Sequence, residues 1–266
     1  MVNIFQYDFM IRAFIVGSIL AIIIPLIGVI VVLKRLSMMG DALSHSSLTG
    51  VAAGLAFGFN PVLGAVFATL LASLSIEAIR KKFPEYSEMS IAIIMSAGIG
   101  LAGILSGFVK NSTGFNSFLF GSIVAITDFE LIFVICTALI VLTSLILLHK
   151  ELFFIAIDER GANLQGVPVK TTNFIFTVLT AITVSIAART VGTLIVSSMM
   201  VIPVASAMQI SKNYRQTCIL SVIFAVIGTI VGLVLSFYIG LKPGATIVMT
   251  CIIMLIIIII VKRNRI

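Results

Sequence analysis

The sequence predicts an all-α fold, a polytopic bundle of transmembrane helices. Hydrophobic residues make up 60% of the chain, and its mean hydropathy is +1.26. Charged residues account for 10%, against roughly 25% in a typical soluble chain. Hydrophobic runs of about 20 residues, the length that a helix needs to cross a bilayer, recur from end to end. These runs are continuous rather than alternating, which argues against a β-barrel.

Nine segments have the length and composition of a membrane-spanning helix. The first is too long for the core of a signal peptide and has no small-residue cleavage site behind it. The second is short and glycine-rich and the seventh contains Pro203, so either is a candidate for a partial helix packed against protein. An eight-span arrangement would move one terminus across the membrane. The expected spans are 13–33, 42–58, 61–79, 90–109, 130–148, 172–188, 190–210, 217–239 and 244–261.

Basic residues set the expected orientation of the chain. Thirteen of the 17 lysines and arginines fall in alternate connections, on one side of the membrane. Because connections rich in lysine and arginine stay in the cytoplasm, topology explains the net charge of +7 better than nucleic-acid binding does. The pattern predicts an external N-terminus and a cytoplasmic C-terminus. The cytoplasmic set is Lys34, Arg35, Arg80, Lys81, Lys82, Lys150, Arg160, Lys170, Lys212, Arg215, Lys262, Arg263 and Arg265.

Two connections are longer than the others. Residues 109–129 are expected to form an outer loop with a short helix. The polar stretch 149–171 is expected in the cytoplasm, where Asp158 suits a helix N-cap and Gly166, followed by Pro168, ends the helix. That short helix is either a knob for a partner's groove or an interfacial connector. Residues 1–266 are expected to form a single membrane domain.

Asp41 and His45 stand near the start of the second expected span, and His45 is one of two histidines in the chain. An ionisable residue within a membrane helix costs roughly 2.5–3.5 kcal/mol on insertion scales, which marks a candidate functional site. Four residues apart, the two side chains project from one helix face. A carboxylate and an imidazole there can hold a divalent cation or pass a proton. The structural alternative is that Asp41 caps the helix and His45 satisfies a nearby carbonyl.

Two ligands are too few for a selective transition-metal site, which normally has about four to six. A symmetric homodimer would supply a second pair if the second spans meet at a two-fold axis. Carboxylate and imidazole together suit Mn²⁺, Zn²⁺ or Fe²⁺ better than Ca²⁺ or Mg²⁺. A site deep in the bilayer would require residues 36–40 to enter it as an irregular, protein-covered segment. A proton-coupled secondary carrier is the competing interpretation of the same pair.

The remaining charged and reactive residues are expected to be structural. Glu77, one turn before Arg80 and Lys81, predicts a surface ion pair. Arg189, between the sixth and seventh spans, is expected to extend to the outer membrane interface. The three cysteines lie far apart in predicted spans, as small packing residues do. Neither a P-loop (GxxxxGK[ST]) nor an HExxH motif occurs, so no enzymatic site is predicted.

Four stretches resemble one known family along nearly the whole chain. They are LKRLSMMGDALSHSSLTGVAAG (33–54), AIDERGANLQGV (156–167), VGTLIVSSMMVIPVASA (191–207) and LSFYIGLKPGATIV (235–248). They are similar to the permease subunits of bacterial manganese, zinc and iron ABC importers. In that family an aspartate and a histidine of a D-A-L-S-H stretch are the proposed metal ligands, which places Asp41 and His45 at those positions.

The resemblance implies a permease with the fold of vitamin B12-type (type II) ABC importers, and members are often described with about eight spans. Two copies would form the path in the bacterial cytoplasmic membrane, surrounded by lipid. ATP would be hydrolysed on a separate ATPase subunit, and a lipoprotein or periplasmic binding protein would deliver the metal. A permease for a metal chelate, such as a siderophore or cobalamin, is a further alternative. The resemblance assigns ATPase coupling to a segment with Asp158, Glu159, Ala162, Leu164 and Gly166.

Overall fold

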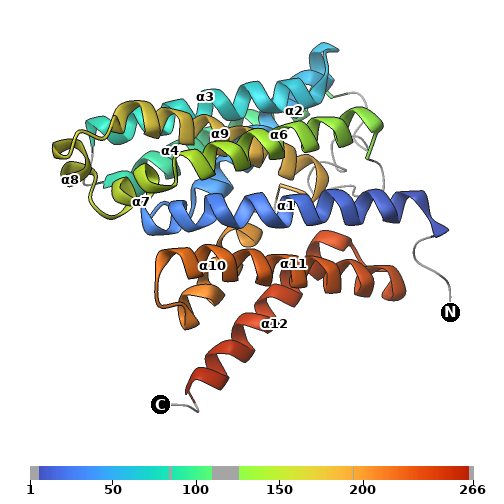
Figure 1. Ribbon diagram of the computed structural model, residues 1–266. Helices are drawn as coiled ribbons and strands as arrows, with labels where there is room; N and C mark the ends of the chain where they lie inside the picture. Colours follow the sequence, from blue (N-terminus) through green and yellow to red (C-terminus); the bar gives the residue numbers. More distant parts are fainter. Residues whose placement is uncertain (1–5, 84–85, 110–125, 194, 264–266) are drawn as a thin grey trace.

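The computed structural model describes residues 6–83, 86–109, 126–193 and 195–263 (Figure 1). The described elements are all helices, and they pack as a bundle with the start of α1 at one end. The expected outer loop at 109–129 lies largely outside the described residues. The helices are α1 (Asp8–Leu33), α2 (Met39–Phe57), α3 (Pro61–Lys82), α4 (Ser87–Ser106), α6 (Asp128–Leu147), α7 (His149–Ile157), α8 (Glu159–Leu164), α9 (Val169–Thr190), α10 (Val196–Ile210), α11 (Tyr214–Ile239) and α12 (Pro243–Arg263).

Each of the nine expected spans is a helix, and seven of these helices are long and apolar enough to cross a membrane. The two that do not qualify are α2 and α10, the second and seventh segments. With 15 residues, α10 rises only about 22 Å, which is less than the thickness of the hydrocarbon core. With 19 residues, α2 is long enough to span but too polar to qualify, and it is covered by α3, α4 and α9. Of the two candidates for a partial, protein-packed helix, only α10 is short.

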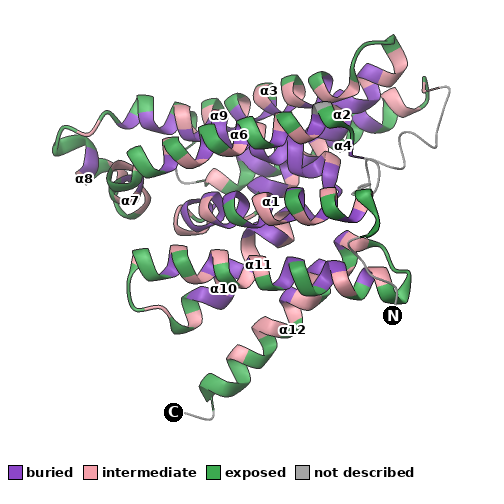
Figure 2. Ribbon diagram, turned by 45° about the vertical axis from the view of Figure 1, so that its right-hand side comes forward, coloured by how far each residue is buried: buried purple, intermediate pink, exposed green. Residues whose placement is uncertain are grey.

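The centre of the bundle is formed by α1 and α9, which are the most buried of the seven long helices. Because α1 is apolar around its whole circumference, it can pack against α6, α9, α10 and α11 at once. Figure 2 shows buried residues gathered in α1, α2 and α9, with exposed residues on the outward faces. In contrast, α12 packs chiefly against α10 and α11 along part of its length and leans away from the body (Figure 1).

Close contact between α2 and α3 depends on two glycines. A Cβ on Gly50 would overlap the backbone of Gly64, and a Cβ on Gly64 would overlap the backbone of Gly50. The two backbones therefore approach more closely than any pair of larger residues would permit. Asn60 begins α3 by accepting hydrogen bonds from Val62 N and Leu63 N, which fixes the tight turn between the two helices.

The basic connections gather at one end of the bundle, on the left in Figure 1, where α8 also lies. The helices that end or begin there carry Lys34, Lys81, Lys170, Lys212 and Lys262. We refer to it as the basic end. The positive-inside rule assigns this end to the cytoplasm.

Candidate functional site

One narrow stripe of α2 remains accessible within an otherwise buried helix. Asp41, His45 and Thr49 are half-buried, whereas the residues between them are buried. The spacing of four places the three side chains along one face, as the sequence predicted for the first two. The N-cap of α2 is Met38, and Asp41 lies in the first turn, so the alternative in which Asp41 caps this helix is wrong.

The Asp41 carboxylate is held by a residue from a distant part of the chain. Ser197, in the first turn of α10, donates a hydrogen bond of 2.6 Å from its hydroxyl to Asp41 Oδ1. Gly40 makes this contact possible, because a Cβ there would touch the Cβ and Cα of Ser197. The bond fixes one carboxylate oxygen and leaves the other free to bind a ligand.

The face of α2 next to His45 is fixed by α4. Thr49 Oγ1 donates a hydrogen bond of 2.7 Å to the carbonyl of Gly98, across the two helices. Gly98 also lies against the backbone at His45 and Ser46. The backbone of α2 at His45 is therefore held by packing between α2 and α4.

Within the described residues, no group of three or more His, Cys, Asp and Glu side chains is arranged to hold a metal ion. Asp41 and His45 thus provide one oxygen and one nitrogen in a single chain. The approach to α2 runs through residues 34–38, an irregular segment in which Leu36 is buried and Met38 is exposed. This segment is only partly covered by protein, and the helix resumes at Met39 rather than after residue 40.

The predicted surface helix exists and has the predicted cap. Asp158 is the N-cap of α8, and its carboxylate accepts a hydrogen bond of 3.0 Å from the backbone N–H of Arg160. Ala162 packs inward on Ile155 and Val169, whereas Leu164 is 88% exposed at the tip. Gly166 has φ +83°, a left-handed conformation that glycine adopts without strain, and it turns the chain into α9.

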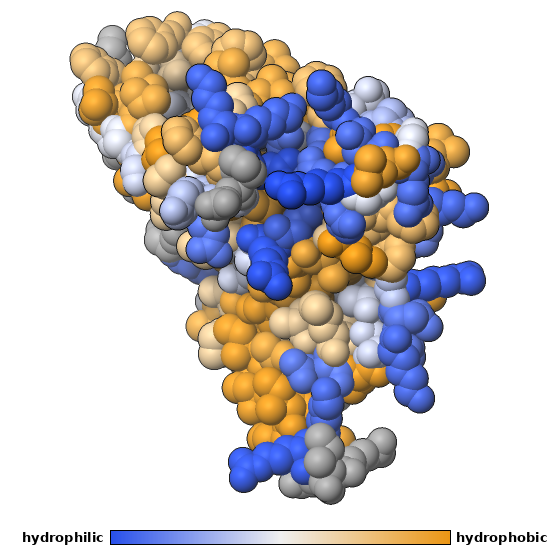
Figure 3. All heavy atoms as spheres, turned by 90° about the vertical axis from the view of Figure 1, so that its left-hand side faces the viewer, coloured by the Kyte–Doolittle hydropathy of each residue, from blue (hydrophilic) through white to orange (hydrophobic). Residues whose placement is uncertain are grey.

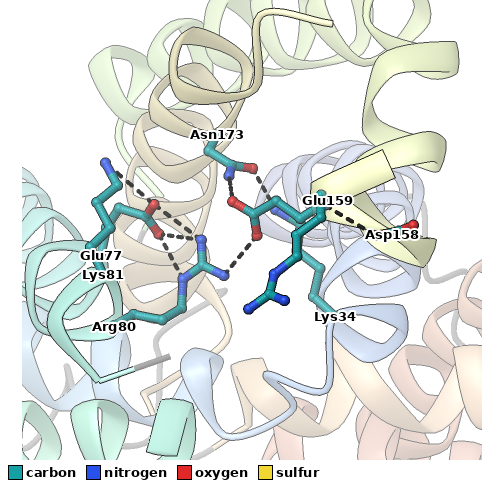
Figure 4. A network of polar contacts seen from close by, with 8 residues as sticks. Lys34, Glu77, Arg80, Lys81, Asp158, Glu159 and Asn173 are labelled. Carbon is teal, nitrogen blue, oxygen red and sulfur yellow. Dashed lines mark hydrogen bonds and ion pairs between the residues drawn. The ribbon is translucent and has the colours of Figure 1, made fainter. Parts of the chain in front are cut away.

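Glu159, the first residue of α8, belongs to a polar network at the basic end (Figure 4). Its carboxylate accepts hydrogen bonds from Asn173 Nδ2 of α9, at 2.9 Å, and from Arg80 Nη1 of α3, at 3.3 Å. Asn173 Oδ1 in turn accepts a bond of 2.6 Å from Lys34 Nζ, directly after α1. The network therefore joins α8 to the segment that leads into α2.

Glu77 forms the other half of this network. Its predicted pairing with Arg80 and Lys81 is confirmed, whereas the expectation that the pair with Arg80 lies on the surface is wrong. Arg80 holds both oxygens of the Glu77 carboxylate, at 3.0 and 3.1 Å, and Lys81 lies 3.6 Å from it. The side chains of Glu77 and Arg80 are only 14% and 15% exposed, because α9 packs along α3 and Glu159 of α8 reaches Arg80. Glu159 supplies the second carboxylate that the buried guanidinium requires.

Lys34 lies at the edge of the network, and burial lowers its pKa to about 8, with a smaller contribution from the nearby Arg80 cation. Glu159 and Glu77 oppose this shift without cancelling it. The ammonium also lies 5.4 Å from the centre of the Phe176 ring. The charge on this lysine is therefore poorly compensated where α1 meets α2.

Arg189 does not extend to the outer interface as expected. Its Nε lies 2.8 Å from Glu130 Oε1 of α6, and the two side chains are 17% and 9% exposed. Glu130 also accepts the backbone N–H of Thr127, which completes the cap of α6. The ion pair thus fastens α6 to the outer end of α9. Three free cysteines are present, of which Cys251 is buried and Cys136 is exposed.

A family model for the ABC 3 transport family matches residues 6–262. The chain belongs to this family. The resemblance drawn from the sequence motifs is therefore confirmed, and the family is one of membrane transport proteins rather than enzymes.

Named relatives carry different metals. The chain is 32% identical over 250 residues to the manganese transport system membrane protein MntC of Listeria monocytogenes, with 94% of this chain and 89% of that protein covered. It is 28% identical over 262 residues to the high-affinity zinc uptake system membrane protein ZnuB of Haemophilus influenzae, with 98% and 100% covered.

The fold is also found among solved structures. The structure of PsaBC from Streptococcus pneumoniae in complex with Fab contains a chain that superposes with a TM-score of 0.85 at 28% identity. The match covers 96% of this chain and 92% of that one. The expected all-helical, multi-pass architecture of an ABC importer permease is thereby confirmed, as is its location in a membrane.

Proposed function

We propose that this chain is the permease subunit of an ABC importer for divalent transition-metal ions. The observation that carries the proposal is the accessible stripe of α2, where Asp41 and His45 face the same way from a buried helix. A carboxylate and an imidazole in this setting are costly for the fold, and binding of a cation would offset that cost. The metal is the cargo, and the two side chains are its ligands during passage.

The path runs between two copies of the chain. One chain contributes only two ligands among the described residues, and a selective site for these metals needs about four. A two-fold axis along the open stripe of α2 brings two carboxylates and two imidazoles together. The half-buried state of Asp41, His45 and Thr49 supports this arrangement, because a second copy would cover them.

The oxygen and nitrogen ligands favour divalent transition metals such as Mn²⁺, Zn²⁺ and Fe²⁺ as the cargo. The manganese and zinc functions named for MntC and ZnuB agree with that range. A site of oxygen and nitrogen ligands without thiolate disfavours Cu⁺.

Transport is driven from the basic end. A separate ATPase subunit binds at α8, and a metal-binding lipoprotein or periplasmic protein delivers the ion to the opposite end. ATP binding and docking of the loaded delivery protein shift the dimer between outward-open and inward-open states, a population shift rather than a chemical step in this chain.

The test is the metal content of cells that express the chain with its ATPase and binding protein under limiting Mn, Zn or Fe. His45→Ala and Asp41→Asn are each expected to abolish accumulation of one metal. Ser46→Ala is the matched control, because Ser46 lies on the buried side of the same helix and its hydroxyl donates a hydrogen bond to Ala42 O, within α2 itself. Equal metal content in wild type and both ligand variants would overturn the assignment.

The same experiment separates the competing functions. Uptake that continues without the ATPase and follows a pH gradient would indicate a secondary carrier. Uptake of a siderophore or cobalamin that is indifferent to His45→Ala would indicate a chelate permease. Loss of a single metal in both ligand variants, with normal membrane insertion, agrees only with the proposed metal permease.

A further inference from the structure

A recess opens at the basic end, beside α8 and between the ends of α3, α4 and α9. Its volume is about 440 Å³. Figure 3 looks onto this end of the molecule and shows hydrophilic side chains gathered across it, with hydrophobic ones around them. The recess is lined by Arg80, Lys81, Ser87, Glu159, Arg160, Asn163, Val169 and Lys170.

Positive charge in this recess exceeds negative charge. The Glu159 carboxylate is already bonded to Arg80 and Asn173, and the neighbouring Glu77 is bonded to Arg80 and Lys81. The negative charges of Glu77 and Glu159 are therefore already neutralised by groups within the network.

Two cations on the rim remain uncompensated. Arg160 and Lys170 are exposed, and within the described part of the chain neither forms an ion pair. They come from different elements, the first from α8 and the second from the start of α9. Together they make the rim a site for an anionic group.

We propose that the recess receives an acidic side chain, an aspartate or glutamate, of the ATPase subunit, held between Arg160 and Lys170. The inference rests on the proposed function, which places the ATPase at α8. Arg160 and Asn163 project from α8 into the recess, and Leu164 of the same helix is exposed to a partner beside it. A single docked subunit would cover the apolar tip and fill the charged recess together.

A lipid phosphate has the same sign of charge but suits the position less well. One wall of the recess is α8, which projects beyond the ends of the long helices, where a soluble subunit can reach it (Figure 1). The acidic protein side chain is therefore the occupant that the surroundings favour. Exposed charge pairs of this kind act through long-range attraction, so they should affect association and its dependence on salt.

The test measures binding of the purified ATPase to the full-length permease in detergent, over a range of ionic strength. The double variant Arg160→Glu/Lys170→Glu is expected to weaken binding at least about tenfold and to remove most of the salt dependence. The neutral double variant Arg160→Gln/Lys170→Gln should weaken it less. Lys262→Glu/Arg263→Glu is the matched control, since it makes the same charge change on α12, away from the recess.

The outcomes distinguish this inference from the proposed function. Wild-type permease that fails to bind the ATPase at all would overturn the proposed function, and the inference with it. Normal binding by both recess variants would overturn the inference alone. Weaker ATPase binding that appears only in phosphatidylglycerol vesicles, and not in detergent, would assign the recess to an anionic lipid. That result would also overturn the inference. If the charge-reversed variant fails to fold, the neutral variant decides between these results.

Discussion

The carboxylate of Asp41 has a fixed orientation because Ser197 donates to one of its oxygens over 2.6 Å. Groups that orient a metal ligand commonly contribute a factor of about 10 to 100 in metal affinity. Ser197→Ala should therefore raise the metal concentration for half-maximal uptake by about that factor, with normal amounts of protein in the membrane. Uptake of radioactive or fluorescently reported metal across a concentration series measures this.

Ser198→Ala is the control for this prediction, because Ser198 is the next residue of α10 and is half-buried to a similar degree. It should leave the half-maximal concentration unchanged. A Ser197→Ala curve that superposes on that of the control would mean that Asp41 needs no fixed orientation to take part in transport.

Lys34 makes the free energy of unfolding depend on pH, and the sign of that dependence follows from its pKa. Its pKa is about 8 in the folded chain, below the ordinary value of 10.5, chiefly because it is buried. Between these two values the unfolded state binds more protons than the folded state, so the free energy of unfolding rises with pH. The contribution is at most about 1.4 kcal/mol per pH unit for one group.

Chemical unfolding in detergent, followed from pH 8 to pH 10, tests this expectation. Lys34→Met should flatten the rise relative to wild type, whereas Lys170→Met should retain it, because Lys170 is exposed. Glu77, Arg80 and Glu159 all face Lys34, so each variant is compared with wild type at the same pH. If the free energies of unfolding of wild type and Lys34→Met change with pH in parallel, the lowered pKa of Lys34 is contradicted.

At the scale of elements, the packing of α2 on α3 should be sensitive to a single methyl group. Gly50→Ala would place its Cβ against the backbone of Gly64, so the helices must move apart. Overpacking of this kind typically costs about 1–3 kcal/mol. Thermal unfolding of the purified chain should show a clear loss of stability, and uptake should fall because α2 carries Asp41 and His45.

Gly103→Ala in α4 is the matched control, since a Cβ there would meet nothing within 4 Å. It should be neutral or should stabilise the protein by up to about 1 kcal/mol, because alanine favours the helix. If Gly50→Ala and Gly103→Ala unfold at the same temperature, the close approach of α2 and α3 does not contribute to stability.

The helices themselves could be predicted from the sequence, whereas their pairings could not. Apolar runs of about 20 residues located all nine of these helices, seven of which qualify as membrane spans, and Pro203 marked the short one, α10. Asp41 and Ser197 are 156 residues apart, and Lys34 and Asn173 are 139 apart. Nothing in one sequence says which helices are neighbours, so both contacts were missed.

Because the sequence does not say which helices are neighbours, the expected positions of two charged residues, Arg80 and Arg189, were also wrong. Arg80 and Arg189 lie near helix ends, where lysine and arginine usually reach water or the membrane interface. Each is instead covered by a second helix that carries a carboxylate, Glu159 in one case and Glu130 in the other. Local spacing found Glu77 as a partner of Arg80, because that pair lies within one helix turn.

At the scale of the whole molecule, a polar network links α8 to Lys34, at the start of the segment that leads into α2, the helix of the proposed metal ligands Asp41 and His45. Glu159 on α8 is bonded to Asn173 and Arg80, and Asn173 to Lys34 (Figure 4). Lys34 is followed by the short irregular segment that begins α2. A displacement of α8 by the ATPase can therefore reach α2 through bonded groups, without passing through lipid-facing helices.

Glu159→Gln should weaken this link while leaving the cap of α8 and the recess cations in place. In the assembled transporter, ATP hydrolysis should continue, but metal uptake per ATP should fall by about 5- to 100-fold, the range of ordinary coupling free energies. Glu88→Gln, an exposed carboxylate in the first turn of α4 at the same end, is the control and should transport normally. The test is to measure ATP hydrolysis and metal uptake together in proteoliposomes. A proportional loss of both would indicate that the ATPase no longer docks. Unchanged uptake would show that the displacement of α8 reaches α2 by another route.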